Sequence, residues 1–140
     1  MTHRKPILLV DDDRVDVMTT KRALKDIHVT NPVYTAGNGE EALELLRDEK
    51  TDKPGIILLD LNMPRMNGTD FLSAIKADVE LRQIPIIVLT VSNDEIDKEK
   101  CFQHSAAGYI VKPHNYEEFI YAIKMLDAYW SLSELPFPDV

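Results

Sequence analysis

A carboxylate stands at the end of an apolar run near the middle of the chain. Residues 56–59 are all leucine or isoleucine, and Asp60 follows them directly. An apolar run of this length is typical of a strand that is buried on both faces of a parallel sheet. Pro64 and the pair Asn67-Gly68 then indicate a loop. Because a lone buried carboxylate is costly unless it is paired or bound to a metal, Asp60 is a candidate for chemistry rather than for packing.

Three further apolar runs also end in polar residues. Asp11 and Asp12 follow the first run, Thr90 the fourth and Lys112 the last. If the runs are parallel strands, these side chains gather at the carboxyl edge of the sheet, where ligands bind. Three carboxylates about 4 Å apart repel by roughly 4 kcal/mol per pair at an effective dielectric of 20, which a hard divalent cation such as Mg²⁺ would relieve. Acids, a metal, a hydroxyl and an ammonium together indicate a phosphoryl-transfer site.

The spacing of apolar residues predicts the elements that would position this site. Strands are predicted at 7–10, 33–36, 56–59, 86–89 and 109–111, and helices at 14–27, from about 40, after 69, after 93 or 94, and at 116–132. Five strands that alternate with five helices predict a three-layer, doubly wound α/β fold of the flavodoxin-like type, with strand order 2-1-3-4-5.

Capping residues and apolar stripes give these helices their expected ends and faces. Asp13 is expected to cap the first helix, Thr69 the third and Asn115 the last. The expected caps of the fourth helix are Asn93 or Asp94. The residues expected on the inner face of the first helix are Val15, Met18, Ala23 and Leu24, and the third helix is expected to contain Phe71, Leu72, Ile75 and Leu81.

The composition limits the class of protein. The chain of 140 residues has a net charge of −8, from 24 acidic and 16 basic residues. An acidic chain lacks the basic patch that nucleic-acid binding requires. A single cysteine, Cys101, excludes an internal disulfide, and no apolar run is long enough for a signal peptide or a membrane span. We therefore expect one soluble, cytoplasmic domain that binds neither nucleic acid nor a membrane.

Four motifs at predicted strand ends resemble those of one known family. Over residues 6–126 the chain resembles the receiver domain of bacterial two-component response regulators, the CheY-like fold. The motifs are Val10-Asp11-Asp12, then Leu59-Asp60 with Met63-Pro64, Met66 and Gly68, then Leu89-Thr90, and finally Gly108-Tyr109 with Lys112-Pro113.

The resemblance implies a phosphorylation site and its metal ligands. Asp60 would take a phosphoryl group from a phosphohistidine of a sensor histidine kinase. Asp12 would bind Mg²⁺ directly, Asp11 mainly through a metal-bound water, and Asn62 through its backbone carbonyl. Apart from its own phosphorylation from phosphodonors and its own dephosphorylation, such a protein is not an enzyme.

The resemblance also implies a switch. Lys112 and the Thr90 hydroxyl would contact the carboxylate or phosphoryl oxygens, and Tyr109 would move inward as Thr90 is drawn toward the phosphate. Pro113 is expected to follow a cis peptide bond that aims Lys112 inward. The residue after the switch threonine is usually small in this family, whereas here it is Val91, which is expected to crowd the phosphoryl group and slow its hydrolysis.

The last predicted helix has two apolar stripes, and a surface helix needs only one. Phe119, Ile120, Ile123, Leu126 and Trp130 form the expected core stripe, and Tyr121, Met125, Tyr129 and Leu132 form a second stripe nearly opposite. A second stripe indicates a further packing partner. We expect a homodimer through this helix and the strand at 109–111, or alternatively an apolar tail that folds back over the domain. Residues 129–136 also resemble short receivers that pair with bacterial phytochromes.

These observations predict a single-domain response regulator. Residues 1–132 would form the receiver domain and residues 133–140 a tail, with no output domain, so that the signal passes through protein contact. Two alternatives stay open. A haloacid-dehalogenase-like phosphatase would use Asp11 as nucleophile and Asp13 as general acid, but the late acidic pair of that family is missing at the ends of the last two strands. A receiver that takes no phosphate would serve only as a scaffold.

Overall fold

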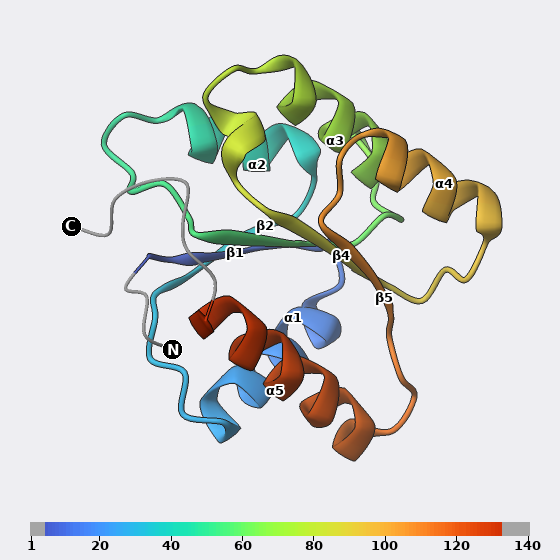
Figure 1. Cartoon of the computed structure of the whole chain (residues 1–140). Helices are drawn as coiled ribbons and strands as arrows, with labels where there is room; N and C mark the ends of the chain where they lie inside the picture. The colour runs from blue at the N-terminus through green and yellow to red at the C-terminus, as the bar shows by residue number, and fades with distance from the viewer. Residues whose placement is uncertain (1–4, 133–140) are drawn as a thin grey trace.

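Five short parallel strands form one sheet in the computed structural model, which describes residues 5–132 (Figure 1). The strands are β1 (Ile7–Val10), β2 (Val33–Ala36), β3 (Ile56–Leu59), β4 (Ile86–Thr90) and β5 (Gly108–Val111). Their order in the sheet is β2-β1-β3-β4-β5. The predicted fold class and strand order are therefore confirmed, and β4 includes Thr90 as its last residue.

Helices cover both faces of the sheet, which gives the three layers (Figure 1). The helices are α1 (Arg14–Asp26), α2 (Gly39–Arg47), α3 (Gly68–Ala77), α4 (Glu95–Gln103) and α5 (Tyr116–Leu132), with a short 3₁₀ helix η1 (Leu81–Gln83) after α3. Helices α1 and α5 lie on one face, and α2, α3 and α4 lie on the other. This arrangement leaves the carboxyl ends of the strands uncovered by any helix layer.

The two cores follow from the alternation of side chains along the strands. Leu8 and Val10 point into the core beneath α2 and α3, whereas Ile7 and Leu9 point into the core beneath α1 and α5. Both faces of the sheet are buried, which explains why every residue of β1, β3 and β4 is buried and why these strands are continuous apolar runs.

The inner face of α1 differs from the prediction. Val15 and Met18 are each 69% exposed, whereas Thr20, Ala23 and Leu24 are buried. Val17 packs against the same core as Ala23 and Leu24, whereas Val15 and Met18 lie on the opposite side of the helix and therefore face solvent. The predicted capping role of Asp13 is confirmed, because its carboxylate accepts hydrogen bonds from the N–H groups of Val15 and Asp16.

Two further predictions about local structure were wrong. Helix α3 starts at Gly68 and is capped by Asn67, because the Asn67 side chain accepts the Asp70 N–H while Thr69 donates its hydroxyl to Asn67. Leu81 lies in η1 rather than in α3. The expected caps Asp94 and Asn115 are confirmed.

The bond before Pro113 also differs from the expectation. All peptide bonds within residues 5–132 are trans. The trans form is the lower in energy for most prolines, and Lys112 reaches the carboxylates at the sheet edge without a cis bond. Among the helices of residues 5–132, none has both the length and the apolar character that a membrane span requires.

Candidate functional site

The register of the sheet brings the predicted residues to one edge. Val10 pairs with both Ala36 and Leu59, so the residues after β1 and β3 leave the sheet side by side. The Asp60 N–H donates to the Val10 carbonyl over 2.9 Å, which fixes the base of that side chain. On the other side, the Lys112 N–H donates to the Thr90 carbonyl over 2.7 Å. One bond joins the end of β1 to that of β3, and the other joins the end of β4 to that of β5. These are the four strand ends at which the sequence motifs lie.

Three carboxylates cluster at this edge. One oxygen from each of Asp11, Asp12 and Asp60 lies within 4.8 Å of the others, a spacing that a metal ion can bridge. Asp60 is 9% exposed and Asp12 is open to solvent. Burial raises the pKa values of Asp60 and Asp11 above the usual range, although Lys112 opposes the shift. Because burial disfavours the charged form of these carboxylates, a nearby cation would stabilise them, and oxygen ligands of this kind suit a hard divalent cation.

Lys112 brings a positive charge to the site and pairs there with Asp11 and Asp16. Its ammonium nitrogen lies 3.0 Å from Asp11 Oδ2 and 3.0 Å from Asp16 Oδ2, with the side chain only 10% exposed. Within residues 5–132 no ion pair of 4.0 Å or less joins Lys112 to Asp60. Burial alone would lower the pKa of Lys112, but the attraction of the neighbouring carboxylates outweighs burial, so the pKa is raised.

Asp16 is the functional-site residue that sequence reasoning missed. By its position alone Asp16 is an acid in the first turn of α1, where a carboxylate is favourable at the helix N-terminus whether or not it has a partner. A signal was present, because Asp16, Thr20 and Ala23 follow the spacing of one helix face, and the latter two are buried. Asp16 lies on the same helix face as these buried residues, one turn closer to the site. Because a carboxylate in such a position needs a partner, a cation is expected nearby, and here it is Lys112.

Thr90 and Tyr109 are joined through Ser92. Thr90 is fully buried, and its hydroxyl accepts a long hydrogen bond of 3.4 Å from the Ser92 N–H. The Tyr109 hydroxyl donates to the Ser92 carbonyl over 2.9 Å. Burial raises the pKa of Tyr109, so the phenol stays protonated as a donor near neutral pH. A movement of the Thr90 hydroxyl would therefore act on the Tyr109 ring through Ser92 alone.

The loop between β3 and α3 is held against α2. The Gly39 N–H donates to the Met66 carbonyl over 2.9 Å, and Arg65 pairs with Glu40 over 2.5 Å. Gly68 packs so closely that a Cβ there would lie 2.6 Å from the Cα of Leu61. The loop that carries Asn62, the predicted carbonyl ligand, is thereby fixed at both ends.

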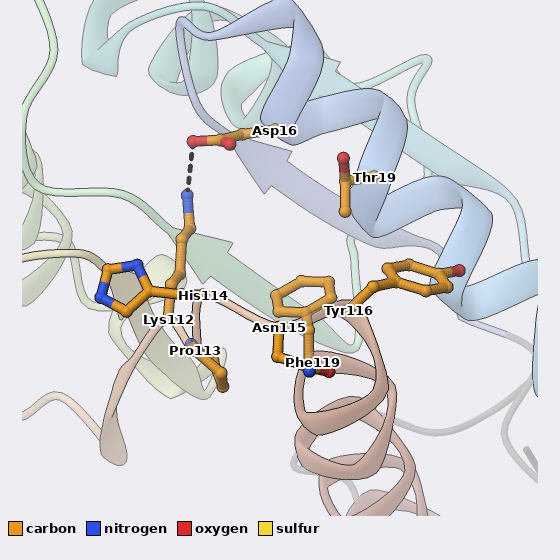
Figure 2. A pocket seen from close by; sticks show the side chains of 8 residues that line it. All are labelled: Asp16, Thr19, Lys112, Pro113, His114, Asn115, Tyr116 and Phe119. Atoms are coloured by element: carbon orange, nitrogen blue, oxygen red, sulfur yellow. Dashed lines mark hydrogen bonds and ion pairs between the residues drawn. The ribbon is translucent and has the colours of Figure 1, made fainter.

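A pocket lies beside this site, between the first turns of α1 and the segment that leads into α5 (Figure 2). It has a volume of 220 Å³. Lys112 and Asp16 line it at one end, and the aromatic rings of Tyr116 and Phe119 line it at the other. Tyr116 is fastened to α1, because its hydroxyl donates to Asp26 over 2.7 Å.

The comparisons with known proteins identify the class of protein. The family model for the response regulator receiver domain matches residues 7–124, which is most of the chain. The chain therefore belongs to the response regulator receiver family. Receiver domains of this family are signalling modules that interact with histidine kinases and are generally not enzymes. No comparison supports the phosphatase alternative, and the carboxylate of Asp13 serves instead as the cap of α1.

Particular relatives show how similar the chain is in sequence and in structure to known response regulators. The chain is 32% identical to the probable methanogenesis regulatory protein FilR2 of Methanothrix harundinacea, over 89% of this chain and 82% of that protein. The structure of the phosphorylated cyanobacterial phytochrome response regulator RcpA superposes with a TM-score of 0.90 at 34% identity, covering 96% of this chain and 99% of that one. The Mn²⁺-bound form of response regulator Rcp1 superposes with a TM-score of 0.87 at 29% identity, covering 95% and 99%.

Proposed function

We propose that Asp60 is the phosphoacceptor of this receiver and that the reaction requires Mg²⁺. The observation that carries the proposal is the convergence of Asp11, Asp12 and Asp60 within 4.8 Å at the sheet edge, beside Lys112 and Thr90. The likeness to a phosphorylated regulator and to one in a Mn²⁺-bound form supports it. A carboxylate that is 9% exposed is accessible to a donor yet shielded from bulk water.

The chemistry is a transfer between a nitrogen and an oxygen. A carboxylate oxygen of Asp60 attacks the phosphorus of a kinase phosphohistidine, the P–N bond breaks, and the imidazole nitrogen takes a proton. A water molecule later attacks the same phosphorus and restores the carboxylate with release of inorganic phosphate. Asp11, Asp12, Asp60 and the carbonyl of Asn62 would hold Mg²⁺, which offsets the charge of the phosphoryl oxygens when bound. Lys112 and the Thr90 hydroxyl donate to the remaining oxygens.

Intact-mass measurement tests the site. The chain is incubated with acetyl phosphate and Mg²⁺, and one phosphoryl group should be gained and lost again on standing. Asp60→Asn should abolish the gain, and fragment masses should place the group on the peptide that contains Asp60. A phosphoryl group on Asp11 would instead support the phosphatase alternative. No gain in the wild-type chain, with or without a kinase, would leave only the scaffold role.

We propose that residues 1–132 act as one receiver unit in the cytoplasm and pass the signal on by protein contact. The free, buried thiol of Cys101 suits a reducing compartment. The likeness to phytochrome response regulators supports a bacteriophytochrome as the kinase partner. Transfer from a panel of purified histidine kinases tests this choice, and a faster transfer from a kinase without a bilin chromophore would contradict it.

We also propose a homodimer through α5 and β5. Helix α5 buries Phe119, Ile123 and Trp130 against the sheet. Its second stripe is open to solvent, and the exposed fractions are 65% for Tyr121, 46% for Met125, 68% for Tyr129 and 88% for Leu132. Strand β5 is the edge strand beside α5, and Val111 on it is 38% exposed. The apolar tail predicted at 133–140 lies outside the described residues.

Sedimentation velocity tests the dimer at micromolar concentration. Tyr121→Glu and Tyr129→Glu should shift the chain toward a monomer, because each places a charge in an apolar contact. Lys124→Gln, on an exposed face of the same helix, serves as the control and should leave the assembly unchanged. A wild-type chain that sediments as a monomer both with and without the phosphoryl group rejects the proposal.

A further inference from the structure

One carboxylate of the site has no part in the proposed phosphoryl transfer. Asp16 projects from the first turn of α1 toward Lys112 (Figure 2), and its Oδ2 lies 3.0 Å from the ammonium nitrogen. The Asp16 side chain is 39% exposed, whereas that of Lys112 is 10% exposed. Asp16 does not belong to the cluster of three carboxylates that could hold a metal. Its one charged partner in the described structure is Lys112.

The ammonium of Lys112 is therefore shared between two elements. One of its three N–H groups is directed to Asp11 at the end of β1, and a second to Asp16 on α1. Both carboxylates lie at equal distance, and Asp60 lies beyond ion-pair range of Lys112 within the part of the chain that is described. The ammonium of Lys112 is thus held in part by a carboxylate that is not one of the three acids clustered around the phosphoacceptor.

We propose that Asp16 is a positioning residue that draws Lys112 toward α1 and thereby disfavours the phosphorylated state. The inference rests on the proposed function of Asp60. A phosphoryl group brings additional negative charge and oxygens that accept strong hydrogen bonds, and Lys112 is the donor available to them. The carboxylate of Asp16 competes for the same ammonium and offsets part of its positive charge. Both effects lower the affinity of the site for a phosphoryl group.

Neutralising Asp16 without changing its shape tests the inference. Asp16→Asn keeps an acceptor oxygen but removes the charge. Because a hydrogen bond between two charged groups is worth more than one to a neutral group, we expect the variant to bind beryllium trifluoride, an acyl-phosphate analogue, about tenfold more tightly at saturating Mg²⁺. The half-life of the acyl phosphate should lengthen in the same variant. The matched control is Asp52→Asn, which makes the same change of net charge on an exposed loop.

A double-mutant cycle separates positioning from a general effect on the fold. If Asp16 acts through Lys112, then Asp16→Asn should change the affinity by less than about twofold in a Lys112→Met background. An equal gain in both backgrounds would mean that Asp16 acts independently of Lys112 and would overturn the inference. So would unchanged or weaker binding of beryllium trifluoride in Asp16→Asn. Thermal unfolding of each variant shows whether the domain is folded.

The proposed function and this inference fail in different ways. Absence of phosphorylation and of beryllium trifluoride binding in the wild-type chain would contradict the role of Asp60. Binding that is lost in Asp60→Asn but unchanged in Asp16→Asn would keep the phosphoacceptor and reject the positioning role.

Discussion

The hydroxyl of Tyr109 donates a hydrogen bond of 2.9 Å to the backbone carbonyl of Ser92. Ser92 is two residues beyond Thr90, and its N–H reaches the Thr90 hydroxyl over 3.4 Å. The ring of Tyr109 on β5 is thus linked to the site through the segment between β4 and α4. If the Thr90 hydroxyl moves toward a phosphoryl oxygen to donate to it, its distance from the Ser92 N–H increases, and the segment that holds Tyr109 is loosened.

Tyr109→Phe should destabilise the unphosphorylated chain by about 1 kcal/mol, because it removes this hydrogen bond while keeping the ring. Urea unfolding measures the change. The same substitution should increase the affinity for beryllium trifluoride. In the wild-type chain the ring must break its hydrogen bond with Ser92 to move inward, whereas a phenylalanine ring has no such bond to break.

Tyr34→Phe is the matched control for this prediction. Tyr34 on β2 is partly buried, and within residues 5–132 its hydroxyl makes no hydrogen bond. Its loss should change neither the stability nor the affinity appreciably. Equal effects of the two variants would show that the Tyr109 hydroxyl is not the link.

The positions of the strand ends could be predicted from the sequence because each buried strand is a continuous apolar run that stops at a polar residue. The pairing of Lys112 with Asp16 could not, since the two residues are 96 positions apart and their contact depends on how α1 packs against α5 and the segment before it. The exposure of Val15 and Met18 was missed for a different reason: both are apolar, but helical spacing places them opposite the face that carries Val17 and Leu24.

Gly68→Ala should destabilise the chain by about 1–3 kcal/mol and slow its phosphorylation. A Cβ at Gly68 would lie 2.6 Å from the Cα of Leu61 and 2.8 Å from the carbonyl oxygen of Asp60, and backbone atoms cannot give way cheaply. The loss would occur although alanine is the better helix former. Urea unfolding and phosphorylation rates with acetyl phosphate measure the two effects.

Gly37→Ala provides the control. A Cβ at Gly37 would meet the end of the Glu41 side chain, with Oε2 at 3.1 Å, and that side chain can shift at the cost of no more than its hydrogen bond with Asn38. A loss of stability as large as that of Gly68→Ala would contradict the assignment of the effect to the packing beneath Asp60.

Asp60→Asn should stabilise the metal-free chain at neutral pH. Burial raises the pKa of Asp60 in the folded state, so the folded chain keeps its proton to a higher pH than the unfolded chain does. The free energy of unfolding contributed by this group therefore falls as the pH rises from the unfolded pKa through the folded pKa. The asparagine variant lacks this loss, and the two chains should converge at acid pH.

Urea unfolding in the presence of a chelator, at several pH values, measures that difference. Asp52→Asn is the control, because it makes the same substitution at an exposed position away from the site. A wild-type chain that is more stable than Asp60→Asn at neutral pH, with a difference that grows with pH, would show that the carboxylate is favourably paired instead.

Val91→Ala should shorten the half-life of the acyl phosphate by a factor of several. Val91 follows Thr90 directly and is 63% exposed, so its branched side chain stands at the open edge of the site. A smaller residue there would admit the water that attacks the phosphorus. Ile96→Ala is the matched control, because Ile96 on α4 is 62% exposed and equally apolar. Half-lives measured side by side by intact mass decide the question, and an equal or longer half-life in Val91→Ala means that the side chain does not shield the phosphoryl group.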